Sequence, residues 1–302
     1  MNRNFIDIKD YKKSELKKIL LFAKKIKKNP KKYSSLLNFK SLGMIFEKQS
    51  TRTRISFMIG MQKLGGNVSE FDTNQIGFGS RETIEDILKV MSQYLDILMI
   101  RNDNHKLLEN LASLNIIPII NGLSDRSHPC QILSDIFTIE ECIGKIENKK
   151  ITWIGDFNNV LVSLIEAAEI FGFKLNVCVP KPFLKLKDKF FTSSKLNNIN
   201  FYNDVFKSVI DSDCIMTDVW ISMGDKNIKK KKEILKKYQV NDNIMKFSKK
   251  TAIFMHCLPA KRNEEVTDSV IDGKHSVVWQ QAQNRMFVQQ SILYYLTKSD
   301  KK

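Results

Sequence analysis

Arginine is scarce in this chain of 302 residues, and two arginines stand where they could bind phosphate. Eight of the 49 Lys and Arg residues are arginines. Arg52 and Arg54 lie in Ser-Thr-Arg-Thr-Arg (residues 50–54), directly after a predicted strand and at the start of a predicted helix. Backbone N–H groups at a helix N-terminus, hydroxyls and a guanidinium together suit a phosphate group. The alternative is an ordinary Ser/Thr cap with surface arginines, and the pattern alone favours neither.

Two further predicted strands also end next to polar residues. Arg101 ends the run Ile-Leu-Met-Ile-Arg, and His128 precedes Pro129, a residue suited to the first position of a helix. Gln131 then falls in the first turn. A histidine at such a position could polarise a carbonyl oxygen, and Gln131 could accept from an amide. Arg101 could equally mark the exit of a strand into solvent, and His128 could be a structural cap.

The second half of the chain offers groups for an amine and a carboxylate. Asp218 follows a predicted strand and could bind an amine, although Asp, Ser and Gly there could also simply form a turn. Asn158 and Asn159, at a predicted helix start, could hold a carboxylate. The turn before them contains Gly155 but lacks G-x-G-x-x-G, so the sequence gives little support to dinucleotide binding.

Cys257 leaves two classes of function open. It follows a predicted strand in His-Cys-Leu-Pro, and a strand-end thiol beside Arg and His could serve as a nucleophile. Equally, Cys257 could line a pocket in which the Leu258 carbonyl, held by Pro259, accepts an amide hydrogen. Arg285 lies near the start of the last predicted helix.

These residues lie at the ends of short apolar runs that alternate with amphipathic segments. The predicted strands are Leu42–Phe46, Asn67–Phe71, Ile97–Ile100, Ile116–Ile120, Ile151–Ile154, Leu175–Val179, Cys214–Thr217, Ala252–Met255 and Val277–Trp279. The predicted helices are Ser14–Lys28, Thr53–Leu64, Thr83–Leu95, Lys106–Leu114, Pro129–Ile143, Val160–Phe171 and Gln283–Thr297. This alternation predicts parallel α/β units whose ligands bind at the carboxyl ends of strands. A polar stretch at Gly144–Lys150 predicts a division into two halves with a cleft between them.

Composition excludes several classes. The net charge of +16 first suggests nucleic acid or an anionic membrane as partner, but 41 of the positive charges are lysines, which fits a solvated surface better. With 42% hydrophobic residues the chain can bury a core, so wholesale disorder is excluded. We find neither a secretory signal nor an apolar run of membrane-spanning length. Five scattered cysteines predict a cytoplasmic protein without a disulfide framework or zinc site.

Taken together, the motifs closely resemble the ornithine carbamoyltransferase family, over nearly the whole chain. The motifs that carry the resemblance are Ser50–Arg54, His128–Gln131, Asp218–Gly224, His256–Pro259 and Arg285, together with residues 119–125 and 264–268. The resemblance implies transfer of a carbamoyl group from carbamoyl phosphate to the δ-amine of L-ornithine, giving L-citrulline and phosphate in arginine biosynthesis. No cofactor or metal is expected.

The resemblance also implies site residues. Carbamoyl phosphate would meet Ser50, Thr51, Arg52, Thr53, Arg101, His128, Gln131, Cys257, Leu258 and Arg285, with Gln75 supplied by a neighbouring subunit of a homotrimer. Ornithine would meet Asn159, Asp218, Ser222 and Met223. Arg52, Arg101, His128, Asp218 and Cys257 would take part in catalysis.

The implied fold is two parallel-sheet α/β domains with the active site in the cleft between them. Residues 1–144 would bind carbamoyl phosphate and residues 145–282 ornithine, and residues 283–302 would form a helix that packs back on the first domain. Neither nucleic acid nor a membrane is expected as a partner.

Three positions depart from the family pattern: Gln49, Gln283 and Phe287. Relatives that use aspartate typically carry His-Pro-Leu-Pro-Arg where this chain has His-Cys-Leu-Pro-Ala, and they use a lysine that residues 74–81 lack here. Relatives that use acetylornithine or putrescine lack or alter the Ser-Met-Gly loop at 222–224. Ornithine is therefore the expected acceptor, with those three amines as alternatives; a cysteine-nucleophile hydrolase and a basic nucleic-acid-binding protein are the rival classes.

Overall fold

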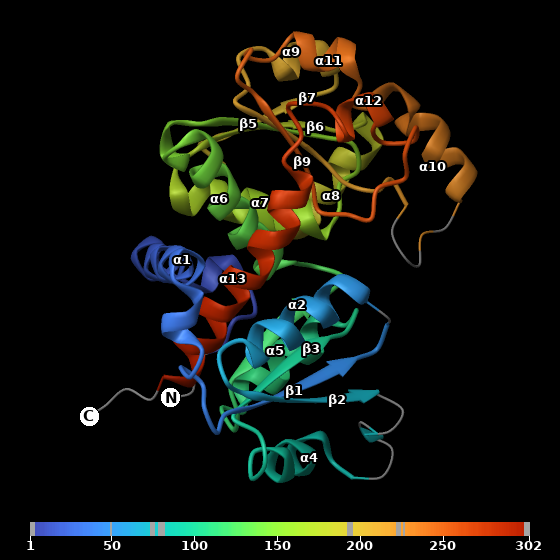
Figure 1. Cartoon of the computed structure of the whole chain (residues 1–302). Coiled ribbons are helices and arrows are strands. Elements are labelled where there is room, and N and C mark those ends of the chain that lie inside the picture. Colours follow the sequence, from blue (N-terminus) through green and yellow to red (C-terminus); the bar gives the residue numbers. More distant parts are fainter. Residues whose placement is uncertain are drawn as a thin grey trace. The chain divides into compact units, whose positions relative to one another are not determined.

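The chain forms two compact units, each built around a parallel β-sheet (Figure 1). The computed structural model describes residues 4–48, 50–72, 76–77, 82–191, 196–221, 225 and 227–298. The first unit contains Met1–Ser134 and Asn284–Lys302, and the second contains Asp135–Gln283. The predicted class, α/β with two parallel-sheet domains, is confirmed.

The first unit has a four-stranded sheet in the order β2-β1-β3-β4, with every pair parallel. Its strands are β1 (Ser41–Phe46), β2 (Asn67–Asp72), β3 (Ile97–Arg101) and β4 (Ile119–Leu123). Its helices are α1 (Lys13–Lys28), α2 (Thr51–Gln62), α4 (Ile84–Met91) and α5 (His105–Ser113), with the 3-10 turns Ile8–Asp10 and Pro30–Tyr33.

Hydrophobic burial fixes the faces of this sheet. Leu88 of α4 and Leu108 of α5 pack in one cluster with Ile45, Leu98 and Ile100 from β1 and β3. Helix α2 lies on the opposite face (Figure 1). Because β1 and β3 pair in parallel, with Phe46 opposite Arg101, their carboxyl ends lie side by side, and the polar residues at both strand ends meet there.

The second unit has a five-stranded parallel sheet in the order β7-β6-β5-β8-β9. Its strands are β5 (Lys150–Ile154), β6 (Lys174–Cys178), β7 (Ile199–Tyr202), β8 (Cys214–Thr217) and β9 (Ile253–His256). Its helices are α7 (Asn159–Phe171), α8 (Lys181–Phe190), α9 (Val205–Val209), α10 (Ile228–Leu235), α11 (Asp242–Lys246) and α12 (Asp268–Ile271), with 3-10 turns at Ile146–Asn148 and Lys236–Tyr238. The chain order switches direction at β5 and β8, where ligands of such sheets usually bind.

The chain passes between the units within two helices, α6 (Pro129–Ile143) and α13 (Val278–Thr297). From Asn284 onward α13 packs on the first unit, as predicted: Gln290 donates to the Gly60 carbonyl (3.0 Å), and Ser291 donates to the Ile19 carbonyl (2.7 Å). The compact units divide inside these helices, and the expected limits of the functional domains at residues 144 and 282 stay a prediction.

Two strand predictions were wrong. Val277–Trp279 is not a strand, because only the Val277 N–H bonds to β9, at the Phe254 carbonyl, and Val278 already begins α13. The helix expected to start at Gln283 therefore starts earlier. Strand β7 was missed because Ile-Asn-Phe-Tyr, at the sheet edge, lacks a continuous apolar run. The remaining predicted strands are present, although β4 begins only after Pro118, which has no N–H to donate.

Helices α8 to α12 were also missed, because they are short or dominated by lysine. In α10 four consecutive lysines hide the apolar spacing, and only Leu235 of that helix is buried. Among the described residues, no helix is both long enough and apolar enough to cross a membrane.

A buried carboxylate secures the chain's start beside β4. The Phe5 N–H donates to the Ile119 carbonyl (2.7 Å), and Asp7, 1% exposed, accepts from the Arg126 guanidinium (2.9 Å). Burial alone would raise the pKa of Asp7, but hydrogen bonds from His105 and Ser127 and the charge of Arg126 outweigh it and lower the pKa to about 2. This network holds the loop that leads from β4 to His128.

We expect Asp7→Asn to lower the free energy of unfolding at pH 7 by about 2 kcal/mol, because the carboxylate's pKa falls below its unfolded value on folding. Such a contribution is complete above about pH 4 and is lost as the pH falls towards about 2. Urea unfolding of both proteins across this range measures it. Asp10→Asn is the control, since burial and the charge of Asp7 raise the pKa of Asp10. Equal losses for the two variants would contradict the assignment.

Candidate active site

At the carboxyl edge of the first unit's sheet, two guanidinium groups meet on one hydroxyl. Arg101, at the end of β3, donates to Ser50 Oγ (2.9 Å) and to Thr53 Oγ1 (3.3 Å). Arg285 of α13, only 4% exposed, donates to Thr53 Oγ1 as well (3.2 Å). The structure thus brings together four of the predicted site residues, and the group suits a ligand with several anionic oxygens.

Ser50 does not behave as an ordinary helix cap. It stands at the N-cap position of α2, but its hydroxyl does not accept from the helix backbone and instead accepts from Arg101. The first-turn N–H groups of α2 are therefore not satisfied by this cap side chain. Thr51 and Arg52 are the first two residues of α2, exposed and half-buried respectively. This arrangement favours the phosphate interpretation of the motif over the structural one.

His128 and Gln131 are buried at the start of α6, which begins at Pro129 as predicted. Burial, together with the charges of Arg285 and Arg101, holds the pKa of His128 well below its usual value. The imidazole is therefore neutral at pH 7 and keeps one N–H to donate. Its neighbour Cys130 is different, because burial raises the pKa of that thiol to about 12 and its S–H points to the Asn121 carbonyl (3.6 Å).

The other arginine of the first motif has a structural role. Arg54 pairs with Glu70 of β2 (2.8 Å), and its guanidinium lies over the Phe46 ring (5.1 Å to the ring centre). Of the two arginines in the motif, Arg54 therefore fits the structural interpretation.

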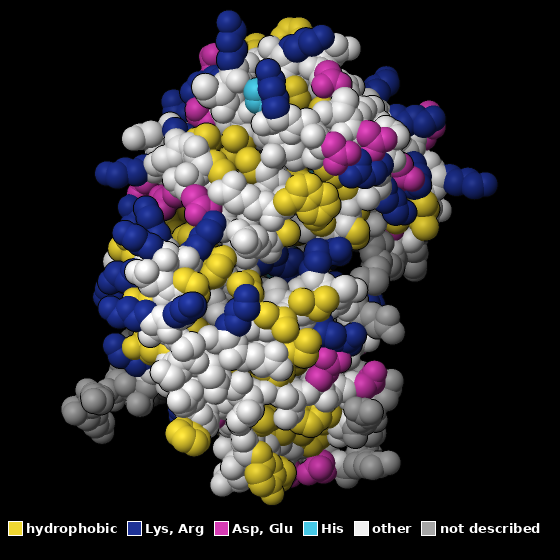
Figure 2. Space-filling model, viewed as in Figure 1, with side chains coloured by type: hydrophobic (Ala, Val, Ile, Leu, Met, Phe, Trp, Pro, Cys, Tyr) yellow, Lys and Arg dark blue, Asp and Glu magenta, His cyan; other side chains and the backbone are white. Residues whose placement is uncertain are grey.

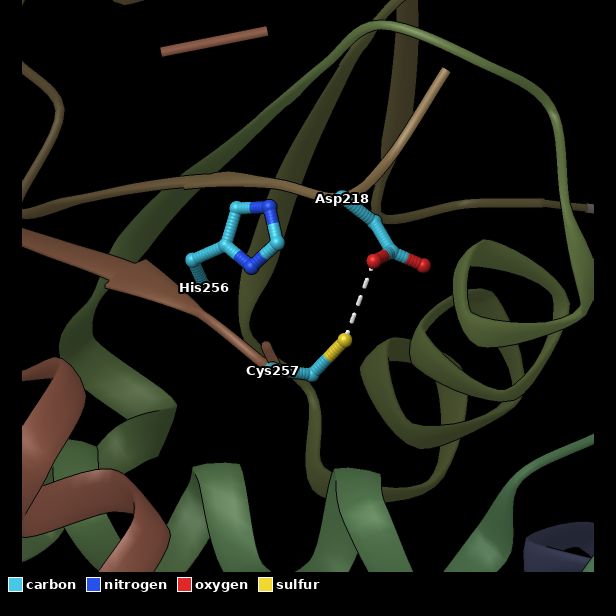
Figure 3. Close-up of side chains that lie close together, drawn as sticks. All are labelled: Asp218, His256 and Cys257. Carbon is cyan, nitrogen blue, oxygen red and sulfur yellow. Dashed lines mark hydrogen bonds between the residues drawn. The ribbon is translucent and has the colours of Figure 1, made fainter. Parts of the chain in front are cut away.

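In the second unit, Asp218 is the centre of a hydrogen-bond network at the carboxyl edge of the sheet (Figure 3). Its Oδ2 accepts from Asn158 (2.8 Å), and its Oδ1 accepts from the Val219 N–H (2.8 Å) and from the Cys257 thiol (3.1 Å). Asn158 also caps α7, since its Oδ1 accepts from the Val160 and Leu161 N–H groups. Sequence and packing therefore fix the Asp218 carboxylate in one orientation.

The segment after β9 is held from the interior. His256 Nδ1 accepts from the Leu258 N–H (2.9 Å), which leaves the proton on Nε2, the nitrogen that faces buried Glu265 (3.3 Å). Gln281 accepts from the His256 N–H (2.9 Å). Leu258 has a φ of 57° in the left-handed region, and the Leu258–Pro259 peptide bond is cis. A non-glycine residue in this conformation is uncommon and needs such support.

The described hydrogen bond of His256 comes from the Leu258 N–H and its Nε2 faces Glu265, whereas the described hydrogen bond of Cys257 goes to a carboxylate. A nucleophilic cysteine needs a neighbouring base or cation that favours its thiolate. A thiolate here would instead stand 3.1 Å from the Asp218 carboxylate. The geometry therefore disfavours the cysteine-hydrolase alternative.

Some predicted site residues are not tested by these contacts. Asn159 is half-buried at the first position of α7, next to Asn158, and Leu258 is half-buried in the segment described above. Gln75, Ser222 and Met223, and likewise Gln49, lie outside the described residues.

Sequence reasoning missed several buried partners, including Glu265, Gln281 and Asp135. Gln281 donates to Asp135 (2.8 Å) while it accepts from His256, and Glu265 accepts from the Lys261 N–H (2.6 Å) as well as facing His256. Asp135 is a polar residue inside an apolar segment, which is a signal of a buried partner, whereas Glu265 and Gln281 stand among other polar residues and give no such signal.

Two groups in the described part of the chain have the spacing of a metal site. Asp218, His256 and Cys257 form one, and Asp7, His105 and Glu109 the other; in each, one ligand atom per residue lies within 4.8 Å of the others. In the first group the Asp218 oxygens and His256 Nδ1 already accept hydrogen bonds, and in the second Asp7 pairs with Arg126. These contacts account for both groups as hydrogen-bonded networks.

Comparisons with known proteins agree with the geometry. Residues 3–141 match the model of the carbamoyl-phosphate-binding domain of aspartate/ornithine carbamoyltransferases, and residues 147–296 match the Asp/Orn-binding domain. The chain is 46% identical to an ornithine carbamoyltransferase of Nitrobacter winogradskyi, with 96% of each chain covered. A relative of the same name from Rhodopseudomonas palustris is 44% identical over 97% of this chain and 96% of its own.

Solved structures give the same result. The ornithine carbamoyltransferase of Pyrococcus furiosus superposes with a TM-score of 0.89 at 40% identity, covering 97% of this chain and 96% of its own. The anabolic enzyme of Campylobacter jejuni superposes with a TM-score of 0.86 at 32% identity, with 97% and 98% covered. The chain therefore belongs to the ornithine carbamoyltransferase family, within the aspartate/ornithine carbamoyltransferases.

Proposed function

We propose that this chain transfers the carbamoyl group of carbamoyl phosphate to the δ-amine of L-ornithine, giving L-citrulline and phosphate. The observation that carries the proposal is the meeting of Arg101 and Arg285 on Thr53, in the same unit as a neutral, buried His128. Two guanidinium groups suit a phosphate, and a neutral imidazole suits a carbonyl oxygen.

In this proposal groups of the first unit bind the phosphate of carbamoyl phosphate. The phosphate is held by Ser50, Thr51, Arg52, Thr53, Arg101 and Arg285, and the carbamoyl group by His128, Gln131, Cys257 and the Leu258 carbonyl. The two hydroxyls already accept from the guanidinium groups, so they keep those groups aimed before any ligand arrives. Such preorganisation reduces the cost of ordering charged side chains on binding.

The second unit binds ornithine. Asp218 would bind the α-amino group, with Asn159, Ser222 and Met223 around the amino acid. The Asp218 carboxylate suits this role because Asn158 and the Val219 N–H hold both of its oxygens in place. A fixed carboxylate selects one direction for ornithine, with the δ-amine pointing away from Asp218.

The reaction is a nucleophilic substitution at the carbamoyl carbon. The neutral δ-amine attacks the carbonyl carbon, a C–N bond forms, and the carbonyl oxygen becomes an oxyanion in a tetrahedral intermediate. The C–O bond to the phosphate then breaks, and the electron pair leaves with the phosphate while the nitrogen loses a proton. His128 donates to the oxyanion, and Arg52 and Arg101 stabilise the charge on the leaving phosphate. Removal of one such donor typically costs about 10²- to 10³-fold in rate.

We expect Arg101→Met to lower kcat/KM for carbamoyl phosphate at least about 10²-fold, because one donor to the phosphate is lost. The assay measures citrulline, with N-acetylornithine, putrescine and aspartate offered in parallel as acceptors. Arg262→Met is the matched control, because that exposed arginine pairs only with surface carboxylates in its described contacts. If the wild type forms product faster from another amine than from ornithine, that amine is the acceptor. If Arg101→Met keeps full activity, the assignment of the phosphate site is wrong.

Cys257→Ser tests the rival mechanism. In the proposed reaction no side chain is acylated, so the serine variant should keep measurable turnover, with its hydroxyl replacing the thiol as the donor to Asp218. Mass spectrometry of the wild-type protein quenched during turnover should find no adduct on Cys257. Complete loss of activity together with a trapped adduct would favour a cysteine nucleophile.

We place the reaction in the cytoplasm and in the direction of arginine biosynthesis. A solved relative, the C. jejuni enzyme, is described as anabolic, and it shares the fold over almost the full chain. We further propose that the chain forms a homotrimer in which Gln75 reaches the carbamoyl phosphate site of a neighbouring subunit.

The shared site predicts complementation between inactive subunits. Gln75→Ala and Arg101→Met homotrimers should both be impaired, but mixed trimers refolded from the two chains should regain part of the activity. Their mixed interfaces contain sites with wild-type residues at both positions. Citrulline formation after refolding at several mixing ratios measures this effect. Activity that never exceeds the sum of the two parents would show that Gln75 acts within its own subunit or has no role.

A further inference from the structure

In the second unit, a largely buried lysine of α10 pairs with two carboxylates from other parts of the chain. Lys231 of α10 places its Nζ 2.6 Å from Asp156 Oδ2 and 2.8 Å from Asp225 Oδ2. The ammonium also lies over the Phe183 ring of α8, 5.9 Å from its centre. Asp156 comes two residues after the end of β5, and α10 is labelled in Figure 1.

This group differs from the many surface lysine pairs of the chain. The side chain of Lys231 is 16% exposed and that of Asp156 is 5% exposed. Breaking a buried ion pair is costly, because removing one partner leaves the other charge buried and uncompensated. The neighbouring Lys232 pairs with Glu264, where both side chains are about one-third exposed, and such pairs contribute little.

Both carboxylates that pair with Lys231 stand close in sequence to residues expected to bind ornithine or to orient its ligand Asp218. Asp156 lies two residues before Asn158, which donates to Asp218. In the sequence, Asp225 comes two residues after Met223. Lys231 therefore joins a residue close to Asn158 to a residue close in sequence to the expected ornithine ligands Ser222 and Met223.

We propose that Lys231 is a positioning residue for the amino-acid substrate, and that its bridge between Asp156 and Asp225 sets the affinity for ornithine. The inference rests on the proposed function, because it assumes that Asp218, Ser222 and Met223 contact ornithine. Lys231 itself does not touch the substrate in this scheme.

The charges of the group also give it a pH dependence. Burial raises the pKa of Asp156 to about 6, although the Lys231 ammonium opposes that rise and Asp225 adds to it. For Lys231, burial alone would lower the pKa, but the two carboxylates outweigh it and raise it. At pH 7 both partners are therefore charged, and below about pH 6 protonation of Asp156 removes one side of the bridge.

Asp225→Asn is the first test, because it removes the Lys231–Asp225 ion pair and leaves the buried Lys231–Asp156 pair intact. We expect its KM for ornithine to rise about tenfold, with KM for carbamoyl phosphate unchanged. Lys231→Met should give at least the same rise, and Lys231→Arg should restore part of the affinity. The double variant Lys231→Met/Asp225→Asn should be no worse than Lys231→Met, because both changes remove the same contact. Lys232→Met is the matched control and should behave as the wild type.

The pH profile separates positioning from a general loss of stability. In the wild type, KM for ornithine should rise below about pH 6, as Asp156 is protonated. In Lys231→Met the rise in KM should begin at higher pH, because the ammonium that opposes protonation of Asp156 is gone. In Lys232→Met the rise should begin at the same pH as in the wild type.

If Asp225→Asn and Lys231→Met are folded and keep the wild-type KM for ornithine and the wild-type pH profile, the inference is wrong. If the variants change KM for ornithine and KM for carbamoyl phosphate equally, Lys231 has only a structural role, and the inference is also wrong. A wild-type chain that makes no citrulline would instead refute the proposed function.

Discussion

Burying charge at the carboxyl edges of two parallel sheets is the constraint on which both the Arg101–Arg285 group and the Asp218 network depend. A charged or polar group without water must find hydrogen-bond partners within the protein. In the first unit Arg285 meets this need through Thr53, which also receives Arg101, so one hydroxyl orients two cations. In the second unit Asp218 meets it through Asn158, the Val219 N–H and Cys257. In each group the hydrogen bonds therefore hold the charged side chains in a defined orientation.

The same constraint decides protonation. Two nearby guanidinium groups and full burial keep His128 neutral, so it can serve as a hydrogen-bond donor without adding a third positive charge. His256 is held in one tautomer by the Leu258 N–H and Glu265, so its role is to shape the segment that carries Cys257. His128, which precedes α6, and His256, which ends β9, thus differ in function because their partners differ. Neither role follows from the residue type.

Much of the fold could be predicted because apolar runs and amphipathic segments alternate clearly. The sites could be predicted only as far as strand ends could be located. Arg101 ends β3, Asp218 directly follows β8, and His128 lies in the segment between β4 and α6; all three strands are buried along most of their length. What was missed depends on tertiary contacts. Lys231 looks like its lysine neighbours in sequence, and only the fold places it between Asp156 and Asp225. Strand β7 and Val277–Trp279 were misjudged because short runs do not reveal which backbone groups will pair.

The arginines and lysines of the chain differ in where their charged groups lie, and the hydration of the two groups explains the difference. Figure 2 shows Lys and Arg side chains spread over the face in view. Among the arginines, Arg101 and Arg285 reach hydroxyls in the interior, because a planar guanidinium can share donors among several acceptors and is weakly hydrated. Lysine ammonium groups are strongly hydrated, and most of those with described pairs meet partly exposed carboxylates. Lys231 departs from this pattern, since two carboxylates and an aromatic ring replace its water. A net charge of +16 therefore says little about function by itself. The few largely buried cations, such as Arg285 and Lys231, are more informative, because each is held by specific partners within the protein.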